Sequence, residues 1–180
     1  MGSRKGQAAM EYLMTYGWAI VALVIVIAAL MATGAFNPSY LIAEECSLQP
    51  DLSCGGHIMY IDGSETTLKF RIDNGLGYPI LLEQVELTLP NQETITADEF
   101  TNPESSTTTT QYMLEQGQSA IVEVDLTGHY DGVKGETARM AVALEYKSCA
   151  PEVIGEESCY TDGSDHVVSG RIVARVEEAS

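Results

Sequence analysis

Hydrophobic residues follow two contrasting patterns along this chain. From Ala8 to Phe36 nearly every residue is apolar or small, and Glu11 is the single charged one. From residue 57 onward, apolar and polar residues alternate in short segments separated by turns rich in Gly, Asn and Asp. A continuous apolar run is typical of a buried or membrane-embedded helix, and a period of two is typical of strands with one wet face. We therefore predict a helix over residues 7–36 and a β-rich region after it.

The apolar run is long enough to cross a membrane. At a rise of ~1.5 Å per residue, a helix over residues 7–36 would be about 45 Å long, and a bilayer core needs roughly 20 apolar residues. Arg4 and Lys5 precede the run, and the next basic residue is Lys69. By the positive-inside rule, the N-terminus stays in the cytoplasm and the chain beyond the helix lies outside the cell.

Glu11 is unusual in such a run, because a carboxylate in a membrane helix costs on the order of 2.5–3.5 kcal/mol at mid-depth. A cut between Gly6 and Gln7 would create an α-amino group about one helical turn away, and ammonium and carboxylate attract strongly at low dielectric. The amino group could also pair with Glu11 of a neighbouring copy and set the stagger between the two helices. We therefore expect Gln7 and Glu11 to act in assembly.

The N-terminal segment resembles the precursor of an archaeal type IV pilin, which carries a class III signal peptide. The resemblance rests on the basic leader, the Lys5-Gly6 cut site, Gln7 and Glu11 as first and fifth mature residues, and the apolar run. It covers roughly the first fifth of the chain and implies cleavage by a prepilin peptidase at Arg4-Lys5-Gly6-Gln7. It also implies that the partners are other copies of the chain and the pilus assembly machinery, with the precursor inserted in the cell membrane before assembly.

Two plainer interpretations of the same segment are weaker. Thr33-Gly34-Ala35 could be the cut site of an ordinary secretory signal, but the apolar run exceeds the roughly 7–15 residues of such a signal's core. An uncleaved membrane anchor explains the length of the run, but it leaves the Lys-Gly-Gln-x-x-x-Glu sequence without a role.

The β-rich region predicts an extracellular domain. Alternating segments predict strands at 57–61, 66–72, 80–89, 119–126, 138–146 and 166–176. With residues 1–6 as leader, 7–36 as helix and 37–56 as connector, residues 57–180 would form this domain. The predicted fold class is α+β: a long N-terminal hydrophobic helix followed by an antiparallel β-sandwich-like domain.

Charge and cysteines agree with an exterior location. The chain has 9 basic and 26 acidic residues and a net charge of −17, which repels phosphate backbones and argues against nucleic acid as a partner. Cys46, Cys54, Cys149 and Cys159 all follow the helix, and an even number outside the cell predicts two disulfides. Spacing favours Cys46–Cys54 with Cys149–Cys159; a four-thiolate zinc site is the alternative, although neither pair has the short spacing of structural zinc sites.

A polar stretch over residues 91–117 is expected to be an exposed loop. Its hydroxyl-rich run is a candidate for O-glycosylation, as such exterior segments are common acceptors, and comprises Ser105, Ser106, Thr107, Thr108, Thr109 and Thr110.

Catalytic motifs are missing from the sequence. Three histidines, His57, His129 and His166, are far apart, and Asp162-Gly163-Ser164-Asp165 lacks the ligand spacing of an EF-hand loop. No G-x-S-x-G, Walker A or H-E-x-x-H motif occurs. We expect no catalytic, cofactor or metal site, and thus a protein that is not an enzyme.

The predicted function is that of a structural subunit in an extracellular filament like an archaeal type IV pilus. Core helices would pack together, β-domains would form the outer sheath, and adhesion would be the usual role. The alternative is a membrane-anchored extracellular receptor or adhesin that does not polymerise.

Overall fold

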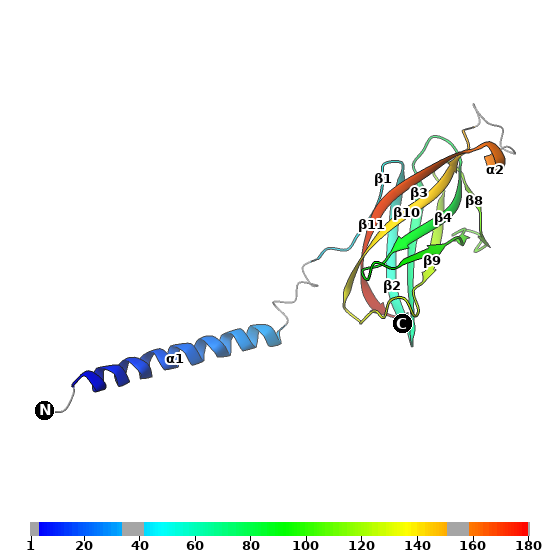
Figure 1. Ribbon diagram of the computed structural model, residues 1–180. Coiled ribbons are helices and arrows are strands. Elements are labelled where there is room, and N and C mark those ends of the chain that lie inside the picture. Colours follow the sequence, from blue (N-terminus) through cyan, green and yellow to red (C-terminus); the bar gives the residue numbers. More distant parts are fainter. Residues whose placement is uncertain (1–3, 34–41, 151–158, 180) are drawn as a thin grey trace. The chain divides into compact units, whose positions relative to one another are not determined.

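The computed structural model describes residues 4–33, 42–150 and 159–179 (Figure 1). The chain divides into two compact units, Met1–Ile42 and Ala43–Ser180, and each is described by itself. The first unit contains helix α1 (Arg4–Ala32), and the second, called the β unit below, contains eleven strands and the short helix α2 (Cys159–Asp162). The strands are β1 (Glu45–Gln49), β2 (Leu52–Asp62), β3 (Glu65–Asn74), β4 (Ile80–Thr88), β5 (Thr94–Ala97), β6 (Phe100–Thr101), β7 (Thr108–Thr109), β8 (Tyr112–Leu114), β9 (Ser119–Asp125), β10 (Thr137–Ser148) and β11 (Ser164–Glu178).

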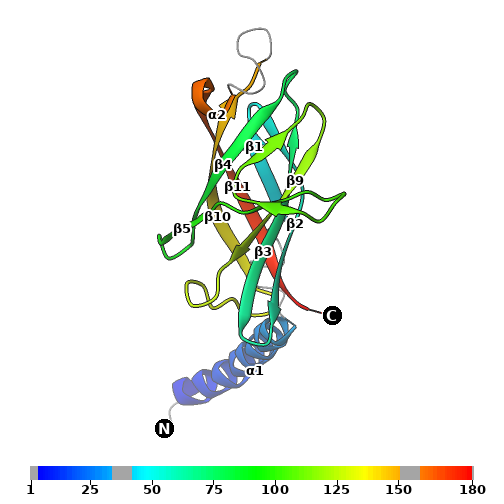
Figure 2. The same ribbon diagram turned by 90° about the vertical axis from the view of Figure 1, so that its right-hand side faces the viewer.

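The predicted fold class, α+β with a long hydrophobic helix and a β-sandwich, is wrong. The structure is mostly β-strand, and its strands form one curled half-barrel sheet in the order β5-β4-β10-β11-β2-β3-β9-β6-β7, with β1 added to β11 and β8 to β4. The physical reason is β11, which pairs antiparallel with β10 over its first twelve residues and parallel with β2 over Val176–Glu178. One strand thus joins what would otherwise be two sheets (Figure 2).

The N-terminal helix also differs from its prediction. It is α1, Arg4–Ala32, and so begins among the polar residues of the predicted leader, before residue 7; residues 34–36 of the expected helix over 7–36 lie outside the described part of the chain. No helix in the described ranges is long and apolar enough to cross a membrane.

Alternating side chains build one continuous core inside the curled sheet. On β3, Leu68, Phe70 and Ile72 are buried while Arg71 between them is exposed, as the sequence pattern predicts. The buried residues of β9 and β10 alternate in the same way and join this cluster. Each such side chain gains roughly 1.5–3 kcal/mol on burial, so these faces fix the register of the sheet.

Two β-bulges exchange the inner and outer faces of their strands. In β4, Gln84 and Leu82 pair with consecutive residues of β10, which leaves Glu83 as the extra residue. Leu82 and Val85 can therefore both face the core although their spacing is odd. Gly55 is the extra residue of β2, and a Cβ there would collide with the side chains of Arg71 and Asp73.

The predicted connector and the predicted polar loop both contain strands. Residues 37–56 include β1 and the start of β2, because Leu48 and Leu52 are each only 2% exposed and belong to the core; the part of this connector before residue 42 lies outside the described residues. Residues 91–117 include β5 to β8, and Phe100 and Leu114 within them are fully buried. In both stretches a few apolar residues among many polar ones give no readable period.

Asn74 is a buried polar residue that ties two turns together. Its side-chain amide donates hydrogen bonds to the carbonyl oxygens of Tyr78 (3.0 Å), Leu114 (2.9 Å) and Glu115 (3.2 Å), and its Oδ1 accepts one from the Leu76 N–H (2.9 Å). Only 2% of Asn74 is exposed. A buried group with all its hydrogen bonds made is costly to replace, because each lost partner remains desolvated.

We predict that Asn74→Asp destabilises the β unit strongly, because its carboxylate would face three carbonyl oxygens. The expected loss exceeds the ~1–3 kcal/mol typical of one unsatisfied buried group. Urea unfolding measures it, with the exposed Asn91→Asp as the matched control. Equal stabilities of the two variants would contradict this role for Asn74.

Tyr146 of β10 is a buried phenol beside an acidic group. It is 2% exposed, stacks on His166 with 5.3 Å between ring centroids, and its hydroxyl donates to Asp51 Oδ2 at 3.4 Å. Burial, followed by the Asp51 carboxylate, raises the pKa of Tyr146 to about 12. The folded protein therefore favours the protonated phenol.

We predict a loss of stability at alkaline pH that depends on Tyr146. Because the pKa is higher in the folded state, the stabilisation is complete below the unfolded value near 10 and is lost as pH rises toward about 12. Urea unfolding at about pH 8 and about pH 11 should show a smaller drop for Tyr146→Phe than for the unchanged chain. Identical drops would show that Tyr146 does not carry the effect.

Candidate assembly surface

Helix α1 exposes apolar side chains around its whole circumference. The consecutive residues Leu23 to Ile27 are each between 40% and 62% exposed, and at 3.6 residues per turn five consecutive residues encircle the helix. Trp18 is 75% exposed and Met14 71%. Among the described side chains from Met10 to Ala32, none is charged. A helix that is apolar on every side is stable in water only when other apolar groups surround it.

A hollow interrupts this surface at Gly17. It has a volume of about 370 Å³ and is lined by Met14, Gly17, Trp18 and Val21, which share one helix face at spacings of three and four residues. A Cβ built on Gly17 meets no atom within 4 Å, so the missing side chain leaves open space. The hollow is shallow and open to the outside, so a side chain of another helix can pack against it.

The sequence-predicted assembly and cleavage residues lie at the start of α1. Arg4, Lys5, Gly6, Gln7 and Glu11 all fall within its bounds. Their side chains lie outside the described part of the chain, so their roles stay predictions.

The four cysteines pair as their spacing favours. Cys46–Cys54 joins β1 to β2, with 5.6 Å between Cα atoms, and Cys149–Cys159 joins the segment after β10 to α2. Leu81 of β4 packs against the second pair. The cysteines of the two disulfides are 8 and 10 residues apart in the sequence, so each bond limits the freedom of the unfolded chain.

The histidines take part in three separate contacts. Their ring nitrogens lie near a backbone carbonyl, a carboxylate and a hydroxyl, in the pairs His57–Val173 (3.1 Å), His129–Glu93 (2.5 Å) and Ser164–His166 (3.0 Å). Within the residues that the structure describes, no three His, Cys, Asp or Glu side chains gather closely enough to hold a metal ion.

The hydroxyl run lies in the segment between strands β6 and β8, which includes the short strand β7. All six residues from Ser105 to Thr110 are exposed, which is the accessibility that O-glycosylation needs. Thr108 Oγ1 lies 2.9 Å from Thr101 Oγ1, and Ser105 donates to Thr107 Oγ1 at 3.1 Å. Glycosylation of these hydroxyls stays a prediction.

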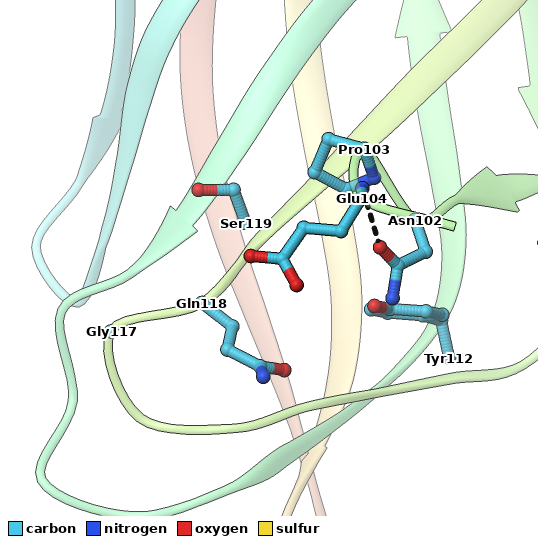
Figure 3. Close-up of a pocket in the computed structure, with 7 residues that line it drawn as sticks. All are labelled: Asn102, Pro103, Glu104, Tyr112, Gly117, Gln118 and Ser119. Carbon is cyan, nitrogen blue, oxygen red and sulfur yellow. Dashed lines mark hydrogen bonds between the residues drawn. The ribbon is translucent and has the colours of Figure 1, made fainter. Parts of the chain in front are cut away.

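A small polar pocket lies beside this segment between β6 and β8 (Figure 3). It has a volume of about 140 Å³. Its lining comes from the segment after β6, from β8 and from residues around the start of β9, and comprises Asn102, Pro103, Glu104, Tyr112, Gly117, Gln118 and Ser119. The Glu104 N–H donates to Asn102 Oδ1 at 2.8 Å, and Ser119 donates to the Asp73 carboxylate at 2.5 Å. Burial is the main cause that raises the pKa of Tyr112. This lining can hydrogen-bond a small polar molecule, but it places no imidazole beside a hydroxyl to activate it.

Comparison with solved structures gives a distant likeness, and comparison with families and characterised sequences gives none. No protein-family model matches the chain, and no characterised relative matches its sequence. Among solved structures, the chain is similar to a chain of the archaeal flagellum of Methanospirillum hungatei strain JF1, with 17% identity and a TM-score of 0.33. The match covers 95% of this chain and 99% of the other. A TM-score that low does not establish a shared fold.

We predict that Gly17→Leu prevents self-association through α1 although it strengthens the helix. Leu at a helix interior is favoured over Gly by up to about 1 kcal/mol, while its side chain would fill the hollow. Sedimentation measures association, and circular dichroism measures helix content. Gly77→Leu, at an open position in the β unit, is the control. Undiminished sedimentation of Gly17→Leu would show that the hollow receives no partner.

Proposed function

We propose that this chain is the structural subunit of an extracellular filament whose core consists of α1 helices from many copies. The observation that carries the proposal is the encircling apolar surface of α1. Burying one large apolar side chain is worth roughly 1.5–3 kcal/mol, and association costs roughly 4–15 kcal/mol in lost freedom. The exposed Trp18 and the run from Leu23 to Ile27 provide several such side chains, so their burial can offset that cost. If identical helices surround each α1, its apolar side chains are covered on every side.

The β unit suits the outer sheath of such a filament. It buries its own core and is tied by two disulfides, so it needs no neighbour to complete its fold. The large negative charge of the chain favours contact with water and opposes unspecific association. Adhesion to surfaces or other cells is the biological role that we propose for the exposed sheath.

The N-terminal residues supply the proposed route of assembly. The resemblance to pilin precursors supports removal of residues 1–6 by a prepilin peptidase, followed by polymerisation by a pilus assembly machinery. The new α-amino group of Gln7 would pair with Glu11 of a neighbouring copy, because two charges buried in an apolar helix bundle need each other. This pair would fix the axial offset between adjacent helices.

The experiment that tests the proposal is N-terminal sequencing and intact mass of the protein in material sheared from cells. A chain beginning at Gln7 in sedimentable fibres is the expected result. A chain beginning at Met1 or Gly2 and found only in membranes would contradict the proposal, and would favour an anchored receptor. A soluble chain beginning near Phe36 would also contradict it, because α1 would then have been removed.

We predict that Glu11→Gln is cleaved normally but assembles poorly. The substitution keeps the size of the side chain and removes its charge, which leaves the Gln7 amino group without its counter-charge. Removing one partner of a buried pair costs roughly 3–5 kcal/mol. Electron microscopy of sheared fibres measures assembly, and the mass of the membrane-bound chain measures cleavage. Glu11→Asp, which keeps the charge, is the control; abundant fibres of Glu11→Gln would refute the pairing.

A further inference from the structure

Three arginines gather on the outer face of β10 and β11. The antiparallel register places Thr137 opposite Arg175, Arg139 opposite Val173, and Ala141 opposite Arg171. Arg139 is therefore a diagonal neighbour of both Arg171 and Arg175, and diagonal side chains on one sheet face lie roughly 7–8 Å apart. Ile172, Ala174 and Val176 belong to the core, so the alternate residues Arg171 and Arg175 point to the opposite, outer face. We call these three residues the arginine patch.

The patch is unusual because positive charge is scarce in the β unit. Nine basic residues stand against 26 acidic ones, and Arg4 and Lys5 belong to α1. Most of the others are paired with carboxylates of the same chain: Lys69–Glu123 (2.9 Å), Arg71–Asp73 (3.0 Å), Lys134–Glu178, Lys147–Glu83 (2.7 Å) and Arg171–Glu45 (2.9 Å). Arg139 is exposed and makes no ion pair or hydrogen bond with the residues that the structure describes. Its guanidinium is available to a partner.

The surroundings of Arg139 leave room for that partner. On the same outer face, its neighbours along β10 are Ala141 and Ala143, and Ser169 follows on β11. Ala141 and Ser169 are exposed, so the side chains on this face are short toward one end, and Val173, directly opposite Arg139, is only 3% exposed. Figures 1 and 2 show β10 and β11 running side by side along the β unit. The exposed Arg139 can therefore meet a carboxylate from outside with two parallel hydrogen bonds.

We propose that the arginine patch is a contact surface between β units, in which Arg139 binds a carboxylate of a second copy. Charge complementarity identifies the partner: each copy carries an excess of carboxylates, and Arg139 is an exposed positive charge that pairs with none of them in the described part of its own chain. Asp98 and Glu99, for example, are adjacent, exposed and without an ion pair in the described chain. The contact rests on the proposed function in one respect, because packing of α1 is what brings the copies together.

Cross-linking of Arg139→Lys tests the contact directly. A carbodiimide joins a lysine amine to a carboxylate only when the two touch, with loss of one water molecule, and the substitution keeps the charge. Filaments assembled from equal parts of isotopically labelled and unlabelled chains distinguish links between copies from links within one. We expect peptides that join residue 139 to an Asp or Glu of another copy, and that disappear when the reaction is run at about 1 M salt, where charges are screened within about 3 Å. Absence of such peptides in filaments would overturn the proposal.

Charge reversal gives a second, independent measurement. We expect Arg139→Glu to raise the protein concentration needed for assembly by about tenfold at low salt, because like charges would then face each other, and by less at high salt. Lys134→Glu, which changes the net charge equally at an exposed site, is the matched control. Equal behaviour of both variants would overturn the proposal while leaving the filament itself intact. If the unchanged chain forms no filaments, the proposed function fails. In that case, cross-linked pairs through residue 139 would still support the contact between β units, and the absence of such pairs would overturn it.

Discussion

The unmatched apolar surface of α1 is the constraint on which this account depends. A strand of the β unit satisfies its apolar face within its own sheet, whereas the exposed residues from Trp18 to Met31 have no such cover in the described part of their own unit. Water cannot stabilise a helix that is apolar on every side, so its natural environment is other apolar groups. The shallow hollow at Gly17, beside Trp18, leaves room for an apolar side chain from outside.

The β unit differs from α1 because its apolar side chains are buried in its own core, so it can remain folded while it faces water. A single curled sheet closes around one core, and β11 holds the two halves together by pairing with β10, β1 and β2. Asn74 holds turns through hydrogen bonds to backbone carbonyls, and the two disulfides join β1 to β2 and Cys149 to α2. The acidic surfaces of two β units repel each other, whereas Arg139 of the arginine patch would attract a carboxylate of a second copy. Attraction through α1 and selective contact through Arg139 would together define the spacing of copies.

Local patterns in the sequence predicted much of this, and non-local pairing explains what they missed. Alternation identified the buried faces of β3, β9 and β10, and cysteine spacing favoured the two pairs that form. The bulges at Gly55 and Glu83 shift the period by one residue, so a strict alternation misplaces part of β2 and β4. The half-barrel depends on the parallel pairing of β11 with β2, and no local sequence pattern predicts that pairing. The arginine patch was missed because Arg139 meets Arg171 and Arg175 only through the register of two distant strands.

Trp18 allows the central claim to be measured directly, because it is the single tryptophan of the chain and is 75% exposed on α1. Its fluorescence can be recorded in sedimented filaments washed free of lipid and again after their dissociation. Packing of α1 against other copies predicts a blue-shifted emission that acrylamide does not quench in the filament, and a red-shifted, quenchable emission after dissociation. A Trp18 that remains quenchable in intact filaments would contradict the account, because the copies would then be held together by something other than α1.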